Sequence, residues 1–291
     1  MVVTLPLRRW GRGPEPLLFV HGFTGTGAAF DHLEPLLGAH VSAAAVDLPG
    51  HGACAPPTDK SFGWNETVEA IASALDRAHG GPAHLAGYSL GARLSLAVAL
   101  RYPRLVRSLL LESGSPGLHK PEDRAARTAG DAELAAQIER DGTAAFVDRW
   151  EKADVLSGLQ KLPTALGAAL RARRLAQSPA GLAWSLRKLG TGSQPDLWPA
   201  LRDLRTPALL VHGSRDDKFR AFAEKMALRI PDANLREIRR TGHAPHLEAP
   251  AGFAAAVLDH LAARRAQAHA EAAHGAPATR DSIEATTGSQ P

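Results

Sequence analysis

Short apolar runs alternate with longer amphipathic stretches over much of the chain. Stretches with apolar residues at helical spacing separate most of these runs. Strands that alternate with helices in this way build parallel sheets covered by helices. The pattern therefore predicts an α/β fold with a mostly parallel sheet flanked by helices. The predicted strands lie at residues 17–20, 41–46, 83–86, 108–111 and 208–211.

One long segment carries no strand signal. Residues 115–204 are charged, rich in alanine and leucine, and helical in period, and a strand returns only at residue 208. We expect a helical cap inserted between two parts of the core, residues 1–114 and 205–265. Residues 266–291 become alanine-rich and then polar, and such a composition buries too little apolar surface to offset its ordering entropy. We predict a disordered tail there.

A serine stands between two glycines directly after the run at 83–86. The motif is Gly87-Tyr88-Ser89-Leu90-Gly91, and the helical pattern that follows ends at a proline, residue 103. G-x-S-x-G is typical of a strained turn from strand to helix that exposes a reactive serine. Ser89 is therefore the candidate reactive group.

A serine hydroxyl needs an imidazole to take its proton and an acid to orient that imidazole. Asp216 and Asp217 follow the strand at 208–213, and Asp216 is favoured as the third residue after the glycine that ends it. His243 is favoured over His246 because it adjoins a glycine in a tight loop. The order Ser, Asp, His is that of the α/β-hydrolase fold.

The residues after the first strand suggest an oxyanion site. The stretch LLFVHGF resembles the segment from which this fold donates a backbone N–H, so Phe23 and Leu90 are the expected donors. His21 is expected to brace this loop. The DLPGHG loop at residues 47–52 is interpreted as architectural.

Charge narrows the choice of ligand. The formal net charge is +4, but arginines are spread along the chain rather than gathered in a run, which disfavours nucleic acid. Arg93 lies one helical turn after Ser89, and a cation in a first turn opposes the helix dipole. Its partner is therefore expected to be an anion, with a buried acid and a substrate carboxylate both left open.

The sequence disfavours membrane-spanning, secreted, disulfide-bonded and zinc-binding proteins. No long uncharged apolar stretch and no cationic-then-apolar start occur, so we expect no membrane span, no signal peptide and a cytoplasmic location. The one cysteine, Cys54, excludes an internal disulfide, and no Cys/His spacing fits zinc. No metal or redox cofactor is expected.

From residue 17 to about residue 253 the chain resembles the family of 2-succinyl-6-hydroxy-2,4-cyclohexadiene-1-carboxylate synthases of menaquinone biosynthesis. Ala92 departs from that pattern, which has a second glycine there, and the C-terminal tail is extra. The most specific motifs are GYSLGAR, SPGL, QPDL and D-x-KF. The others are FVHGFTG, VDLPGHG, EDRAAR, FVDRW and GHAPHLE.

The resemblance implies a lyase that removes pyruvate from a cyclohexene bearing succinyl, enolpyruvyl and carboxylate groups, without hydrolysis, metal or organic cofactor. It implies that Ser89, deprotonated through His243 and Asp216, abstracts a ring proton. The anionic oxygen formed on the succinyl side would face the Phe23 and Leu90 amides.

The implied substrate is a small polycarboxylate, so the pocket should hold several cations. The matching positions are Arg93, Arg127 and Arg174, with Tyr88 and Trp150 lining the site. Arg127 and Arg174 could instead be solvated faces of cap helices, and Trp150 could be core. The alternatives to the lyase are a serine carboxylesterase acting on a small acidic ester and a catalytically silent binding protein.

Overall fold

The computed structural model describes residues 3–275 and is built on a seven-stranded sheet with the order β1-β3-β2-β4-β5-β6-β7. β1 runs antiparallel to β3, and every other neighbouring pair is parallel. All five predicted strands are confirmed. Their bounds are β1 Leu7–Trp10, β2 Glu15–Val20, β3 Val41–Val46, β4 Ala83–Tyr88, β5 Val106–Glu112, β6 Ala208–Gly213 and β7 Ala233–Ile238.

The two edge strands were not among the predicted runs. β1 reads LRRW and β7 reads ANLREI, and most of their residues are exposed or half-buried. A strand at the edge of a sheet can present polar side chains to water, so it lacks the continuous apolar run of a central strand.

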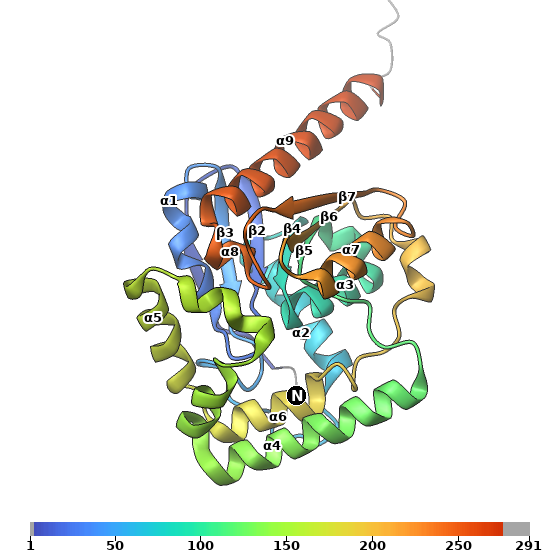
Figure 1. Ribbon diagram of the computed structural model, residues 1–291. Helices are drawn as coiled ribbons and strands as arrows, with labels where there is room; N and C mark the ends of the chain where they lie inside the picture. Colours follow the sequence, from blue (N-terminus) through green and yellow to red (C-terminus); the bar gives the residue numbers. More distant parts are fainter. Residues whose placement is uncertain (1–2, 276–291) are drawn as a thin grey trace, which may run out of the picture.

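Helices cover both faces of the sheet (Figure 1). One apolar core lies under α2 (Trp64–His79), α3 (Leu90–Arg101) and α7 (Asp217–Ala227). The other lies under η1 (Gly27–Leu33), α1 (Glu34–Leu37) and α9 (Pro250–Gly275). Two short elements complete the core, η2 (Pro103–Leu105) before β5 and α8 (Pro245–Glu248) before α9.

Every regular element within residues 115–204 is helical. Figure 1 shows this segment in green to yellow, below the sheet. Its helices α4 and α6 pack through buried apolar residues that Phe23 of the core also contacts. α4 kinks at Gly142, where φ is 81°. The elements are α4 Pro121–Trp150, η3 Asp154–Lys161, α5 Thr164–Leu175, α6 Pro179–Leu189 and η4 Pro199–Asp203.

The boundary of the predicted tail needs a correction. α9 continues to Gly275, so residues 266–275 are helical rather than disordered. Alanine, glutamine and glutamate are good helix formers, and they extend a helix whose first half is anchored on the core by Phe253, Val257 and Leu261. Residues 276–291, the rest of that prediction, lie outside the described residues.

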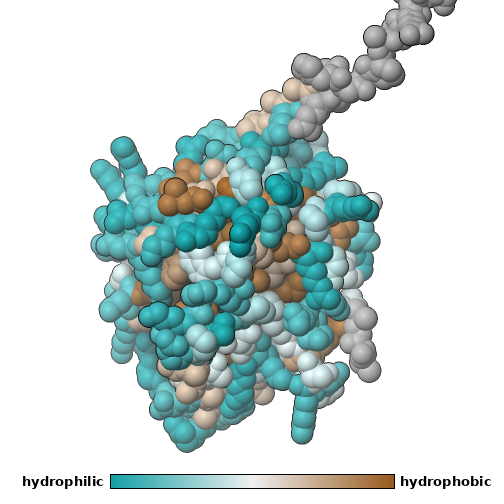
Figure 2. Space-filling model, turned by 90° about the vertical axis from the view of Figure 1, so that its right-hand side faces the viewer, coloured by the Kyte–Doolittle hydropathy of each residue, from teal (hydrophilic) through white to brown (hydrophobic). Residues whose placement is uncertain are grey.

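The face of the molecule shown in Figure 2 is largely hydrophilic. Figure 2, which views the right-hand side of Figure 1, shows small and separate hydrophobic areas among polar ones. Leu228 is the most exposed of the large hydrophobic residues that the structure describes. Within residues 3–275, no helix combines the length and the apolar character needed to cross a bilayer.

Candidate active site

Ser89 lies on a strained turn between β4 and α3. Its φ of 52° and ψ of −106° fall in a region that residues with a side chain rarely occupy, and it precedes the first residue of α3. Its N–H donates to the Glu112 carbonyl oxygen at 2.9 Å, which ties the turn to the neighbouring strand β5. The chain therefore holds the serine at the carboxyl edge of the sheet.

The glycines on either side of Ser89 are required by close packing. A methyl group at Gly87 would overlap the backbone of Gly91, and one at Gly91 would overlap the carbonyl group of Val20. The two glycines let α3 approach β2 and β4 directly, as the G-x-S-x-G motif predicts.

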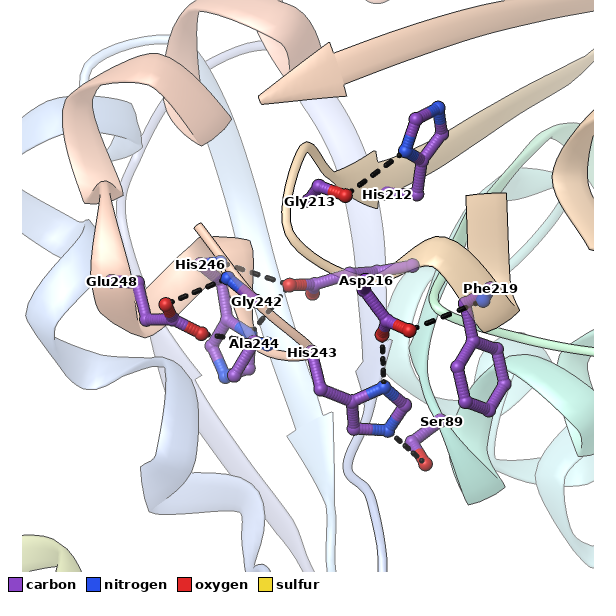
Figure 3. Close-up of polar contacts among 11 residues, drawn as sticks. Ser89, His212, Gly213, Asp216, Phe219, Gly242, His243, Ala244, His246 and Glu248 are labelled. Carbon is purple, nitrogen blue, oxygen red and sulfur yellow. Dashed lines mark hydrogen bonds and ion pairs between the residues drawn. The ribbon is translucent and has the colours of Figure 1, made fainter. Parts of the chain in front are cut away.

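A hydrogen-bond chain connects Ser89, His243 and Asp216 (Figure 3). His243 Nδ1 lies 2.8 Å from Asp216 Oδ2, and His243 Nε2 lies 3.1 Å from Ser89 Oγ. Because the carboxylate only accepts, Nδ1–H donates to Asp216 and Nε2 accepts from the serine hydroxyl. The imidazole is thereby placed to take the serine proton.

The structure distinguishes Asp216 from Asp217 as the acid, and His243 from His246 as the imidazole. Asp216 is 8% exposed at its side chain and reaches His243, whereas Asp217 is 84% exposed and pairs with Arg220. His246 is buried, and its Nδ1–H donates to Glu112 at 2.9 Å, away from Ser89. The hydrogen bonds therefore favour Asp216 and His243, as the sequence did.

Two buried histidines brace the loop that carries Phe23. His21 accepts from the Leu48 N–H at 3.0 Å, and His51 accepts from the Thr24 N–H at 3.3 Å. Both rings use Nε2 as the acceptor, so both are neutral. Burial lowers the pKa of His21, and it lowers the pKa of His51 to about 3.

The braced loop lies against the serine turn. A methyl group at Gly22 would meet the Tyr88 ring and would lie 3.4 Å from Ser89 Cβ. Among residues 3–275, neither the Phe23 nor the Leu90 N–H donates a hydrogen bond to another protein group. Leu90 opens α3 and so has no acceptor within its helix. Both N–H groups are therefore available near Ser89.

Arg93 contacts neutral groups rather than an acid. Its guanidinium donates to Gln194 Oε1 and to the Leu189 carbonyl oxygen, both at 3.1 Å, and it packs over the Trp64 ring. Burial lowers the pKa of Arg93 to about 9, the nearby charge of Arg127 contributes in the same direction, and the nearby Asp131 opposes the shift. The guanidinium is thus a partly desolvated cation that no carboxylate of residues 3–275 bonds directly.

Arg127 and Arg174 occupy different environments. Arg127 is half-exposed and bonds Asp131 at 2.8 Å, one turn along α4. Arg174 is buried, bonds Glu151 at 3.1 Å, and its Nε has no partner among the described residues. The interpretation of Arg174 as a solvated helix face is therefore wrong, while Arg127 is partly solvated.

The predicted aromatic residues adjoin the serine and the braced loop. The Tyr88 ring centroid lies 5.5 Å from that of His243, and burial raises the Tyr88 pKa while the nearby Arg174 opposes the rise. Trp150 stacks on Phe146 and meets Phe23 edge-on at 5.6 Å. Trp150 is thus at the junction of cap and core.

Several residues near the site were not predicted individually. Gln194 bridges Arg93 and the Ser115 carbonyl oxygen, and Phe219 packs against His243 with ring centroids 4.5 Å apart. Glu112 and Glu248 bind backbone N–H groups of the loop that carries His243. Gln194, Phe219 and Glu248 lie in the motifs QPDL, D-x-KF and GHAPHLE, so the motifs indicated these segments but not the contacts that they make.

Comparison with known proteins gives consistent results. The model of the alpha/beta hydrolase family matches residues 17–256. A Bacillus subtilis protein described as a putative 2-succinyl-6-hydroxy-2,4-cyclohexadiene-1-carboxylate synthase is 35% identical, over 85% of this chain and 90% of its own. The Enterobacter synthase of that name is 32% identical, over 85% of this chain and 92% of its own.

The similarity extends to a solved structure. MenH from S. aureus superposes with a TM-score of 0.85 at 30% sequence identity, and the match covers 90% of this chain and 99% of that one. Core and cap are thus both included in the match.

Proposed function

Because the chain belongs to the alpha/beta hydrolase family, and within it to the 2-succinyl-6-hydroxy-2,4-cyclohexadiene-1-carboxylate synthases, we propose that it is the lyase of that name in menaquinone biosynthesis. It eliminates pyruvate from 2-succinyl-5-enolpyruvyl-6-hydroxy-3-cyclohexene-1-carboxylate. The observation that carries the proposal is the hydrogen-bonded chain of Ser89, His243 and Asp216 in a member of this family.

Ser89 acts as the base in this mechanism. His243 takes the serine proton at Nε2, and Asp216 stabilises the imidazolium that results. The serine oxygen then removes a proton from the ring carbon that carries the succinyl group. The released electron pair moves through the ring double bond, and the bond between the ring and the enolpyruvyl oxygen breaks. Pyruvate leaves as its enolate, which takes up a proton.

The backbone N–H groups of Phe23 and Leu90 stabilise the charge that develops on the succinyl carbonyl oxygen. Neither N–H has an acceptor among the described residues, and both belong to segments beside Ser89. The succinyl carbonyl oxygen would lie near them when the adjacent ring carbon faces the serine oxygen. Preorganised donors of this kind are each worth about 3–4 kcal/mol in related reactions.

The arginines bind the substrate carboxylates. Arg93 is best suited, because a partly desolvated cation whose two acceptors in the described part of the chain are neutral gains most from an incoming anion. The unpartnered Nε of Arg174 and the half-exposed guanidinium of Arg127 supply further donors at the cap side. Tyr88 and Trp150 provide the apolar walls.

The test is an assay of pyruvate release from the enolpyruvyl cyclohexene, with nitrophenyl esters supplied in parallel. We expect pyruvate release by the native chain and its loss in Ser89→Ala. Fast ester hydrolysis without pyruvate would establish a serine carboxylesterase instead. Absence of both activities would identify a binding protein.

A further inference from the structure

The side chain of Glu248 binds the loop on both sides of His243. Oε2 accepts from the Gly242 N–H at 2.7 Å, and Oε1 accepts from the Ala244 N–H at 3.2 Å (Figure 3). One carboxylate therefore holds the N–H groups of the residues before and after His243. Such a bracket fixes the backbone from which the imidazole projects.

The cap rests on the same carboxylate. Gly158 in η3 approaches Glu248 so closely that a methyl group there would overlap Oε2 and Cδ. The contact is part of a larger seam, in which Leu159, Leu162, Leu166 and Leu170 of the cap pack with Ala244 and Leu247 of the His243 loop. Cap and loop thus share one apolar cluster beside Glu248.

We propose that Glu248 is a positioning residue that couples the seating of the cap to the orientation of His243, in the reaction proposed above. Glu248 has no hydrogen bond to Ser89, His243 or Asp216 side chains among the described residues and acts through the backbone of residues 242–244. With the cap seated, Gly158 confines the carboxylate so that each oxygen faces one N–H. With the cap lifted, water competes for both oxygens and the two hydrogen bonds to the backbone weaken.

The imidazole has little tolerance for such loosening. It must keep the 2.8 Å contact to Asp216 and the 3.1 Å contact to Ser89 at the same time. A displacement of about 1 Å in a catalytic group costs on the order of 100-fold in rate. The coupling would make His243 most effective when the cap covers the substrate.

The experiment compares Glu248→Gln, Gly158→Ala and the double variant, with Gly167→Ala in α5 as the control. Among the described residues, a methyl group at Gly167 would meet only Leu162 Cβ, at 4.0 Å. Glutamine keeps one acceptor but presents an NH₂ group to the other N–H. We expect each single variant to lower kcat about 10- to 100-fold with KM within about twofold, and the control to match the native enzyme.

The double variant is the discriminating measurement. Both substitutions disturb the same two hydrogen bonds, so their effects on kcat should not multiply. The kcat of the double variant should equal that of the worse single variant within about threefold. If Glu248 only stabilises the fold, the variants will have a lower free energy of unfolding in urea, but kcat per folded molecule will equal that of the native enzyme. That result, or independent multiplication of the two effects, overturns the proposal.

Labelling of Ser89 by a fluorophosphonate separates this proposal from the proposed function. The label reports the Ser89–His243 pair without the substrate. Slower labelling in Glu248→Gln and Gly158→Ala, with no pyruvate release by the native chain, would reject the lyase and keep the positioning role. Native labelling rates in both variants would reject the positioning role.

Discussion

Replacement of Asp216 by asparagine tests the proposed base most directly. Asp216 Oδ2 accepts from His243 Nδ1–H, while Oδ1 accepts from the Phe219 N–H and caps α7. Asparagine caps helices about as well as aspartate, so the fold should be retained. Its NH₂ group would then face Nδ1 and favour the tautomer with the proton on Nε2. That tautomer cannot accept the proton of Ser89.

The expected loss follows from burial. Asp216 and His243 are 8% and 7% exposed at their side chains, so the imidazolium would lose a buried carboxylate partner. Removal of one partner of a buried ion pair costs about 3–5 kcal/mol. At about 1.4 kcal/mol per factor of ten, kcat should fall by roughly 10² to 10⁴. KM should change little, because Asp216 is not expected to contact the substrate.

The neighbouring residue supplies the matched control. Asp217→Asn removes the same charge one position along the chain, but Asp217 is 84% exposed and its side chain pairs with the surface residue Arg220. Its effect should stay within about 0.5 kcal/mol, or roughly twofold in kcat. Steady-state pyruvate release is followed with lactate dehydrogenase and NADH. Equal losses in the two variants, or a kcat for Asp216→Asn within threefold of native, would refute the reasoning.

A substitution of Arg93, a substitution of Gly91 and a change of pH should each change activity or stability in a direction that the structure predicts. Arg93→Lys keeps the charge but loses the planar guanidinium, which bonds two protein acceptors and is proposed to bind a carboxylate. The value of kcat/KM for pyruvate release should therefore fall about 10- to 100-fold. A change under threefold would contradict this. Gly91→Ala should destabilise the fold by about 3 kcal/mol through backbone overlap, whereas Gly130→Ala, which meets open space in α4, should stabilise it by about 1 kcal/mol in urea unfolding. Equal shifts would contradict the packing argument. Burial lowers the pKa of His51 to about 3 from 6.5, so its contribution to stability is present above pH 6.5 and is lost as the pH falls toward 3. Between pH 7 and 5 the free energy of unfolding should fall by about 2 kcal/mol from this group, and His51→Gln should remove that part of the pH dependence. An unchanged pH dependence in the variant would show that His51 is not responsible.

The sequence by itself determined the central strands, the serine turn and the order of the reactive groups. Each is local: an apolar run, two glycines around Ser89, or a polar residue directly after a strand. The edge strands β1 and β7 were not predicted because most of their residues are exposed or half-buried, so neither has a continuous apolar run. The helical continuation to Gly275 was not predicted because composition alone does not show that the helix is already anchored.

Only the tertiary structure decided which side chains meet. His243 reaches Asp216 across 27 positions and Ser89 across 154, so local spacing could rank the alternatives Asp217 and His246 but not exclude them. The neutral acceptors of Arg93 and the carboxylate beneath Gly158 likewise come from segments far away in the chain. Periodicity records which face of an element is buried, whereas the partner on the other side is set by how the elements pack.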